Sequence, residues 1–489
     1  MHSMFGVNCS SPRSGMYNKT KQKLLRQLRR TLVLIMDERS MIASSLLGAS
    51  ARNCKETAHG GVHQNLSWGG IPIVILVGDD HQLPPVEIGG KGKGAFYVLS
   101  GRDNCVNSNW GSHVESLGVS QFLELTDTVS ALSKVERQDV GNTEHTSLLT
   151  NLRPPNKLTR SQVNRLLRLD VKTLRAETND DITENSMHIY AFKDDAKKWN
   201  RKCVVEKSSA TNPVAMLKGS GKSSASRLGK VIHSHFNNEQ TPLSTNIFHG
   251  ARVSIRGRNF VPEWGLFNGA IGTVDEIVFK DDESPNDNNL PLYVAVHFEN
   301  YTGPVWDPQN PKVVPIPIIN VPCNRDHRCC SLNVCPLVPA YATTIHKFQG
   351  QSAGPTRKGQ KVNEVQRIVC CPGTILFESQ NPGLLYTLIS RATTIGTPGQ
   401  DDSAIYFIGD FIEEPRLTNI HLTRDGKVYD KVQRRDKWIN HLQSRLKPFN
   451  ISDEEQNQLF QWASCETTRY TKDELNEIID TVSPQFKNI

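Results

Sequence analysis

Two adjacent carboxylates follow a short apolar run near the start of the chain, and such a pair could serve a phosphate reaction. Residues 32–36 are aliphatic and end in Asp37 and Glu38. Neighbouring residues of a strand point in opposite directions, so the two acids can take different roles. Asp37 could hold Mg²⁺, and Glu38 could orient and deprotonate an attacking water. The alternative is a strand that ends in a solvated acid pair.

A second apolar run, residues 71–77, leads into a more specific string, Gly78-Asp79-Asp80-His81-Gln82-Leu83-Pro84-Pro85-Val86. Gly78 permits a tight exit from the strand. The neutral amide of Gln82 can contact a γ-phosphate or its bound water without adding charge. Both runs are predicted to be buried parallel strands, and ligands of open α/β sheets bind at the carboxyl ends of such strands.

Later in the chain, many hydrogen-bond donors lie close together in residues 342–352. They are Thr343, Thr344, His346, Lys347, Gln349 and Gly350. Such a loop can bond the phosphate oxygens of a nucleic-acid backbone and of a nucleotide. Residues 385–392 predict an amphipathic helix that carries Arg391 at its end. Arg391 is either a surface residue or a finger that stabilises charge on a transferred phosphoryl group.

The order of these motifs resembles the Pif family of DNA helicases, RecD-like members of superfamily one. The match spans residues 1–410, and its strongest parts are the strings that begin at Asp37, Gly78, Thr344 and Tyr386. Three weaker pieces agree with it. Residues 2–7 resemble the family's motif Ia, residues 136–138 resemble motif IV, and residues 265–274 resemble the opening of its SH3-like insert.

This resemblance implies two RecA-like α/β domains of the P-loop NTPase type, with an inserted SH3-like β-barrel. It implies an ATP-dependent DNA helicase that uses ATP and Mg²⁺ in the cleft between these domains. The enzyme would unwind duplex DNA by moving 5′ to 3′ along single-stranded DNA. A monomer in the nucleus or the mitochondrion is expected, with roles in DNA repair, recombination and telomere maintenance.

The resemblance also implies roles for individual residues. The implied catalytic residues are Asp37, Glu38, Gln82 and the two fingers, Arg137 and Arg391. The implied nucleotide contacts are Asp37 (through Mg²⁺), Gly78, Asp79, Gln82, Gln349, Gly350 and Arg391. The implied DNA contacts are His2, Ser3, Thr343, Thr344, His346 and Lys347.

Three departures from the family pattern stand out. Phe348 replaces a usual Ser or Ala, and Asp80-His81 replaces a pair that is commonly aromatic. The family's Gly-x-x-x-x-Gly-Lys-Ser/Thr loop is absent, so the first RecA-like domain is expected to be incomplete. An inactive fragment, or a DNA-binding remnant without ATPase activity, is therefore the alternative function. Gly219-Ser220-Gly221-Lys222-Ser223 has Met216 where that loop needs its first Gly, and a flexible loop is predicted there.

The expected domain order follows these motifs. The predicted segments are 1–125 (first RecA-like domain), 126–250 (start of the second, with a flexible loop over 207–246), 251–335 (β insert), 336–412 (rest of the second) and 413–489 (helical extension). The net charge of +7 and the acid-free basic run of residues 13–30 are compatible with a polyanion partner. No apolar run is long enough to span a bilayer.

The 11 cysteines, an odd number, predict free thiols in a reducing environment. Five possible zinc ligands lie within thirteen residues: Cys323, His327, Cys329, Cys330 and Cys335. Their spacings lack the paired Cys-x-x-Cys form of common zinc sites. Free or half-buried thiols are therefore the preferred prediction, and a zinc site is the alternative.

Overall fold

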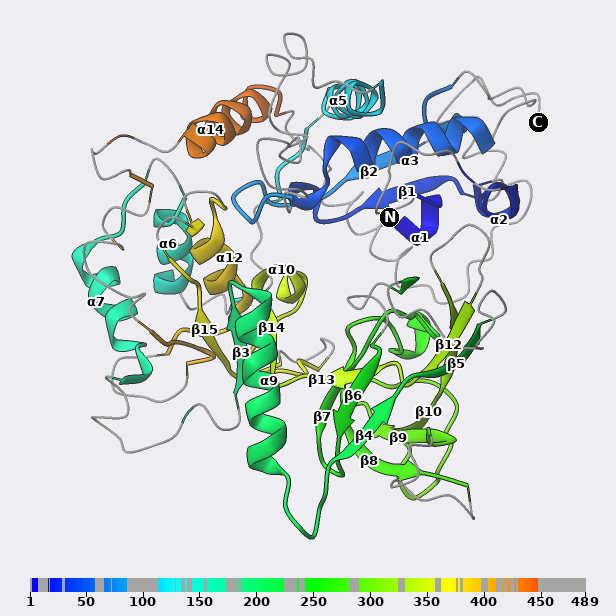
Figure 1. The fold of residues 1–489 in the computed structure, drawn as a ribbon. Helices are drawn as coiled ribbons and strands as arrows, with labels where there is room; N and C mark the ends of the chain where they lie inside the picture. Colours follow the sequence, from blue (N-terminus) through cyan, green and yellow to red (C-terminus); the bar gives the residue numbers. More distant parts are fainter. Residues whose placement is uncertain are drawn as a thin grey trace. The chain divides into compact units, whose positions relative to one another are not determined.

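A computed structural model of the full chain gives the fold (Figure 1). Two compact units make up the chain. Unit 1 comprises Met1–Lys134, Ser379–Gly383 and His421–Ile489, and unit 2 comprises Val135–Glu378 and Leu384–Ile420. The structure describes residues 2–7, 16, 18–28, 31–57, 66–71, 73–85, 113–127, 129–132, 137–138, 143–153, 156–172, 182, 186–223, 235–236, 242–280, 290–323, 330–356, 362–374, 377–378, 381–396, 403–409, 417, 421–422, 427 and 430–446.

Unit 1 contains the two predicted parallel strands. β1 (Val33–Met36) pairs in parallel with β2 (Ile73–Leu76). Burial on both faces was expected from the continuous apolar runs, and this expectation was wrong. Leu34 and Met36 are each 3% exposed, whereas Ile35 is 62% exposed, so only alternate side chains of β1 enter the core.

Two helices of unit 1, α3 (Ser44–Thr57) and α5 (His113–Leu125), pack against each other through close backbone contact. A Cβ added at Gly48 would lie 1.9 Å from the carbonyl oxygen of Val114, and one added at Gly118 would lie 1.9 Å from that of Ser44. Glycine therefore permits α3 and α5 to cross closely. The helices of unit 1 are α1 (His2–Phe5), α2 (Asn18–Leu28), η1 (Arg39–Met41), α3 (Ser44–Thr57), η2 (Ser67–Gly70), α5 (His113–Leu125) and α14 (Asp430–Gln443).

Unit 2 is built around a parallel sheet in the order β14-β3-β15-β16. Its strands are β3 (Met187–Tyr190), β14 (Ala342–Thr344), β15 (Ile368–Cys371) and β16 (Ile405–Phe407). Its helices are α6 (Thr143–Asn151), α7 (Arg160–Arg168), α9 (Lys193–Lys207), α10 (Ile345–Phe348) and α12 (Leu384–Arg391). A mixed α/β fold with parallel sheets was predicted, and it is confirmed.

An antiparallel sheet is inserted between β3 and β14 (Figure 1). Its order is β10-β9-β8-β7-β13, and alternate residues such as Val253 and Ile255 are fully buried in its core. The strands are β7 (Arg252–Ile255), β8 (Ile271–Val278), β9 (Tyr293–His297), β10 (Val313–Pro317) and β13 (Leu337–Pro339), with the short helix η5 (Pro262–Trp264). The predicted β-rich character of this region is confirmed, and its SH3-like class stays a prediction.

The predicted flexible loop over 207–246 is wrong, because its described part contains three strands. These are β4 (Ala215–Lys218), β5 (Ser220–Ser223) and β6 (Ser244–Ile247). β4 pairs with β6, and β5 joins β11 (Ile319–Pro322) and β12 (Cys330–Val334) in the order β11-β12-β5. A Cβ at Gly221 would lie 2.1 Å from the carbonyl oxygen of Ser331, so glycine is needed for this pairing. The Gly-Ser-Gly-Lys-Ser string therefore lies largely in β5, an edge strand of its three-stranded sheet.

Two remaining predictions concern the C-terminal helical extension and the absence of membrane-spanning segments. Helix α14 lies within the predicted helical extension 413–489, and residues 447–489 lie outside the described part. Among the helices that the structure describes, none has the length and apolarity to cross a bilayer.

Candidate nucleotide-site residues and nucleic-acid interface

The first acidic motif and the string after β2 lie on adjacent loops of unit 1. The backbone N–H of Val77 donates to the Met36 carbonyl at 2.8 Å, and that of Arg39 donates to the Val77 carbonyl at 3.0 Å. These bonds continue the parallel ladder beyond both strands. Asp37 is exposed and accepts a bond from the backbone N–H of Glu38 at 2.7 Å. The carboxylate of Asp37 is therefore open to solvent beside the second loop.

Glu38 adopts a backbone conformation that side chains rarely take. Its φ and ψ are 55° and 47°, in the left-handed region that favours glycine. Such strain costs roughly 1–3 kcal/mol and concentrates at functional sites. Gly78 faces this turn, because a Cβ there would lie 2.7 Å from the backbone nitrogen of Arg39. The observed strain and the close approach together mark this turn as a candidate site.

A buried ion pair joins the two loops, and the sequence patterns did not reveal it. The Arg39 guanidinium donates to both carboxylate oxygens of Asp80, at 3.0 and 2.5 Å. Burial raises the pKa of Asp80, and the bond to Arg39 opposes this rise. From the sequence, Asp80 was noted only as a departure from the family, and Arg39 was not singled out. The structure explains the departure, since the carboxylate matches the arginine across the turn.

The turn that presents Gln82 is fixed by its own backbone and by two distant residues of unit 1. Asp79 accepts bonds from the N–H of His81 through its side chain at 3.0 Å and from that of Gln82 through its carbonyl at 3.1 Å. Arg435 of α14 donates to the His81 carbonyl at 3.3 Å. Gly383, with φ +93°, passes so close that a Cβ would lie 2.1 Å from the same oxygen. Asp79 and Gln82 are thus held by a packed turn.

In unit 2, the two predicted fingers lie on neighbouring segments. Arg137 donates to the Ser352 hydroxyl at 2.8 Å and to the Ser390 carbonyl at 3.1 Å. Gln138 donates to the same carbonyl at 3.2 Å. Arg391, the last residue of α12, is 2% exposed. The structure therefore brings Arg137 beside the end of the helix that carries Arg391, while both roles stay predictions.

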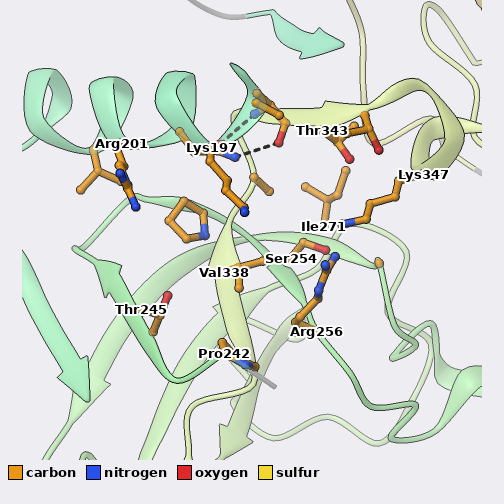
Figure 2. Close-up of a pocket in the computed structure, with 18 of the residues that line it drawn as sticks. Lys197, Arg201, Pro242, Thr245, Ser254, Arg256, Ile271, Val338, Thr343 and Lys347 are labelled. Atoms are coloured by element: carbon orange, nitrogen blue, oxygen red, sulfur yellow. Dashed lines mark hydrogen bonds between the residues drawn. The ribbon is translucent and has the colours of Figure 1, made fainter. Parts of the chain in front are cut away.

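A pocket of about 850 Å³ opens in unit 2 between α9, β14 and strands of the antiparallel sheets (Figure 2). Its lining contains Ser, Thr and Asn side chains and no acid among the described residues. Figure 2 shows the side chains of Lys197, Arg256 and Lys347 directed into the same space. The basic residues of the lining are Lys193, Lys197, Arg201, Arg256 and Lys347. A lining with five cations and no carboxylate suits a polyanion.

Helix α9 and strand β14 hold the wall of this pocket together. Asn200 accepts bonds from the backbone N–H groups of Tyr341 and Ala342, at 2.9 and 2.8 Å, and donates to the Ala342 carbonyl at 2.9 Å. This clamp fixes the start of β14, which delivers Thr343 and Thr344 to the lining. The predicted contacts Thr343, Thr344 and Lys347 are therefore gathered in one pocket.

The rest of the 342–352 segment has other surroundings. His346 does not belong to the pocket lining. Burial lowers the pKa of His346, helped by the charge of Lys193, which favours the neutral ring. Phe348 is 1% exposed, which accounts for an apolar residue at this departure from the family. The backbone N–H of Gln349 donates to the Ile345 carbonyl at 3.1 Å, and Gly350 has φ +89°, which favours glycine.

Some predicted contacts could not be placed, and some lining residues were missed. His2 begins α1, and the side chains of His2 and Ser3 lie outside the described part of the chain. Lys193, Lys197 and Arg201 were missed, although their 4-residue spacings on a helix would have indicated one basic face. Arg256 could not be found in this way, because only the folding of the insert brings it to this pocket.

No family model matches the chain, and no curated protein matches it. Solved structures do. A structure of two coordinating Pif1 helicases at forked double-stranded DNA has 19% identity and a TM-score of 0.57, over 90% of this chain and 83% of that chain. Pif1 helicase from Candida albicans has 19% identity and a TM-score of 0.58, over 90% and 84%.

A third similar structure contains ligands. Bacteroides Pif1 helicase in complex with ADP-AlF3 and single-stranded DNA has 20% identity and a TM-score of 0.55, over 85% of this chain and 79% of that chain. Each comparison covers both units and most of the solved chain. The chain contains parallel sheets and matches these solved structures over most of its length, so it has the fold of the Pif1 helicases.

Proposed function

We propose that this chain is an ATP-dependent DNA helicase that holds single-stranded DNA in the cationic pocket of unit 2. The observation that supports this most directly is the lining itself. Five cations without a carboxylate lie beside Thr343 and Thr344, whose hydroxyls can bond phosphate oxygens. Pif1 helicases of the same fold have been solved with single-stranded DNA and with forked duplex DNA.

The nucleotide chemistry is proposed from the residues that follow β1 and β2. Mg²⁺ prefers carboxylate oxygens, and the exposed carboxylate of Asp37 fits that preference. Glu38 would take the proton of the attacking water, and Gln82 would contact the γ-phosphate. Arg137 and Arg391 would stabilise the charge that develops on the phosphoryl group. A Bacteroides Pif1 structure that contains ADP-AlF3 supports a nucleotide substrate for this fold.

Movement from 5′ to 3′ along one strand, coupled to hydrolysis, completes the proposal. Gln349 and Gly350 follow the pocket residue Lys347 with only Phe348 in between, so one segment could connect DNA contact with nucleotide contact. We further propose a nuclear or mitochondrial location with a role in DNA maintenance. Fluorescent tagging of the chain in its own cells tests that location.

The DNA proposal has a closely matched test on one helix. Lys197 lines the pocket, whereas its neighbour Lys198 does not. Both are exposed, and each has an acid three residues earlier, at 3.4 Å for Lys197 and 3.7 Å for Lys198. Lys197→Ala should weaken binding of a labelled single strand and lower the salt slope by about 0.7, the share of one phosphate contact. Lys198→Ala should leave both quantities near the wild-type values.

Anisotropy titrations over a salt series measure both quantities, with Lys347→Ala and Arg256→Ala as further pocket variants. Equal losses in Lys197→Ala and Lys198→Ala would contradict the pocket as the DNA site. The alternative, a DNA-binding remnant, has its own outcome. It would be favoured if single strands bind through the pocket while ATP turnover stays at background with and without DNA.

A further inference from the structure

The geometry points to a zinc-type metal site formed by His235, Cys323 and Cys330, at the end of the hairpin of β11 and β12. The nitrogen and sulfur ligand atoms of these residues all lie within 4.8 Å of one another. This inference does not depend on the proposed function.

The two cysteines are brought together by strand register. Pro322 pairs with Ser331 in the β11–β12 hairpin, so the next pair is Cys323 with Cys330. The backbone N–H of Cys323 donates to the Cys330 carbonyl at 2.9 Å, which confirms this pairing. Side chains of directly opposed residues lie on the same face of a sheet, about 5 Å apart at Cβ.

That shared face is the buried one. On β12, Cys330, Leu332 and Val334 are buried at 4%, 1% and 0% exposure, and the residues between them are not. Cys323, at 4% exposure, belongs to the same small core. Both thiols therefore point away from solvent into one space.

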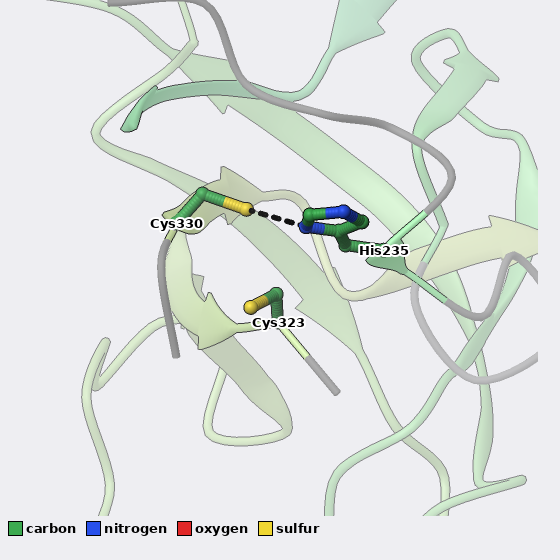
Figure 3. A group of neighbouring side chains, drawn as sticks. All are labelled: His235, Cys323 and Cys330. Atoms are coloured by element: carbon green, nitrogen blue, oxygen red, sulfur yellow. Dashed lines mark hydrogen bonds between the residues drawn. The ribbon is translucent and has the colours of Figure 1, made fainter. Parts of the chain in front are cut away.

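The third ligand arrives from a segment far away in the sequence. Phe236 is 7% exposed and packs in the same core as the two cysteines, which anchors its neighbour His235 beside them. Figure 3 shows the three side chains gathered around one small space. The Sγ of Cys330 lies 3.7 Å from Nδ1 of His235.

This spacing is close to what a tetrahedral ion requires. Zinc bonds of about 2.3 Å to sulfur and about 2.0 Å to nitrogen place neighbouring ligand atoms roughly 3.5–3.8 Å apart. The Cys330–His235 distance already has this value, and since all three ligand atoms lie within 4.8 Å of one another, the remaining pairs need to approach by only about 1 Å. Two thiolates and one neutral imidazole leave the site uncharged with a divalent ion, which suits a buried position.

Binding of the metal ion would release protons from the two thiols. Each thiol exchanges its S–H bond for an S–metal bond, so two protons are released, and His235 binds through Nδ1 as the neutral ring. Three ligands leave one tetrahedral position, which water can occupy. His327 and Cys329, which were grouped with this cluster from sequence, lie outside the described residues.

Cys335, also grouped with the cluster from sequence, provides the matched control. It is buried in the core of the five-stranded antiparallel sheet, and it is not among the gathered ligands. Burial raises the pKa of the Cys335 thiol to about 12, so it stays protonated. Cys335→Ala thus removes a nearby buried thiol without touching the proposed site.

The experiment uses the full chain, reduced and stripped of metal, with Zn²⁺ and Co²⁺ as probes. One ion per chain is expected by elemental analysis, with the absorption bands of tetrahedral, thiolate-bound Co²⁺. Cys323→Ser, Cys330→Ser and His235→Ala should each weaken binding more than about 100-fold, since even changes behind the ligands cost 10–100-fold. Cys335→Ala should keep the ion.

Two measurements keep the test decisive if a variant folds poorly. His235→Cys should retain Co²⁺ with shifted bands, because sulfur replaces nitrogen. In the wild-type chain, removing zinc with a chelator should lower the unfolding temperature. The site would be excluded by substoichiometric metal in the reduced protein, by a Cys323–Cys330 disulfide found by mass spectrometry, or by equal loss of metal in Cys335→Ala.

Discussion

At the scale of single residues, the candidate site of unit 1 includes a turn that local sequence patterns describe only in part. Asp37, Glu38, Asp79 and Gln82 were predicted as site residues from their types and spacing, because acids and amides that follow apolar strands are informative on their own, and their roles stay predictions. The Arg39–Asp80 ion pair was not found, because its partners are 41 positions apart and Asp80 was noted only as a departure from the family. The strained backbone of Glu38 also has no sequence signal, since the left-handed region favours glycine.

The Arg39–Asp80 pair makes a prediction about stability. Asp80→Leu should cost about 3 kcal/mol of unfolding free energy, because it leaves the Arg39 guanidinium, 17% exposed, without its carboxylate. The double variant Arg39→Met/Asp80→Leu should recover most of that loss. A buried ion pair often contributes little more to the free energy of unfolding than apolar residues of similar volume at the same positions. Urea unfolding followed by circular dichroism measures both. Equal stability of the single and double variants would show that the pair is not coupled.

At the scale of elements, the sequence predicted the positions of the apolar strands well, overestimated their burial, and failed for the polar strands. The runs that became β1 and β2 are aliphatic and bounded by turn residues, so their type could be predicted locally. The segment with β4, β5 and β6 is rich in Ser, Gly, Asn and Lys, a composition that indicates loops. β5 exists because it pairs with β12, over 100 residues later, and no local pattern contains that partner.

Helices α6 and α12 provide a prediction that depends on pH. His145 of α6 is fully buried, and its Nε2 lies 3.4 Å from the Ile389 carbonyl of α12. Burial lowers the pKa of His145 from 6.5 to about 4. The hydrogen bond to the Ile389 carbonyl raises this pKa in part, and the positive charge of Arg165 lowers it further. Between these values the unfolded chain binds a proton that the folded chain does not. Stability should therefore be complete above pH 6.5 and fall as the pH drops toward 4.

The free energy of unfolding should fall by at most about 3 kcal/mol through the titration of His145, as a pKa difference of this size implies. His145→Gln is the matched variant, since its amide can still donate to the Ile389 carbonyl and does not titrate. Urea unfolding from pH 4.5 to 7.5 should show the wild type losing more stability than His145→Gln on the acidic side. Parallel pH profiles for the two proteins would rule out His145 as the cause.

At the scale of the whole molecule, the residues proposed for hydrolysis are divided between the two units. Glu38 and Gln82 belong to unit 1, and Arg137 and Arg391 belong to unit 2. The 489 residues contain no complete Gly-x-x-x-x-Gly-Lys-Ser/Thr pattern, whose backbone and lysine hold the phosphates in P-loop enzymes.

A chain extended ahead of Met1 with the strand, P-loop and helix of a solved Pif1 helicase tests this division. Its ATP turnover should rise with single-stranded DNA. Glu38→Gln should abolish turnover and spare nucleotide binding, because the amide keeps the shape of the acid and cannot take a proton. Arg391→Ala should slow turnover about 10³-fold or more. If Arg391→Ala matched its parent in rate, the finger assignment of the α12 motif would be wrong.

The strand order of unit 2 also governs how the protein is made. β3 lies between β14 and β15, and both of these neighbours come later in the chain. β14 follows β3 only after roughly 150 residues, so at 5–20 residues per second a ribosome needs about 8–30 seconds to synthesise the first partner. During that interval both edges of β3, a strand that is buried in the folded protein, lack partners, while strands β7 to β10 of the inserted antiparallel sheet are synthesised and can begin to pair. The nascent chain should therefore engage chaperones soon after Tyr190 emerges and be released after Thr344.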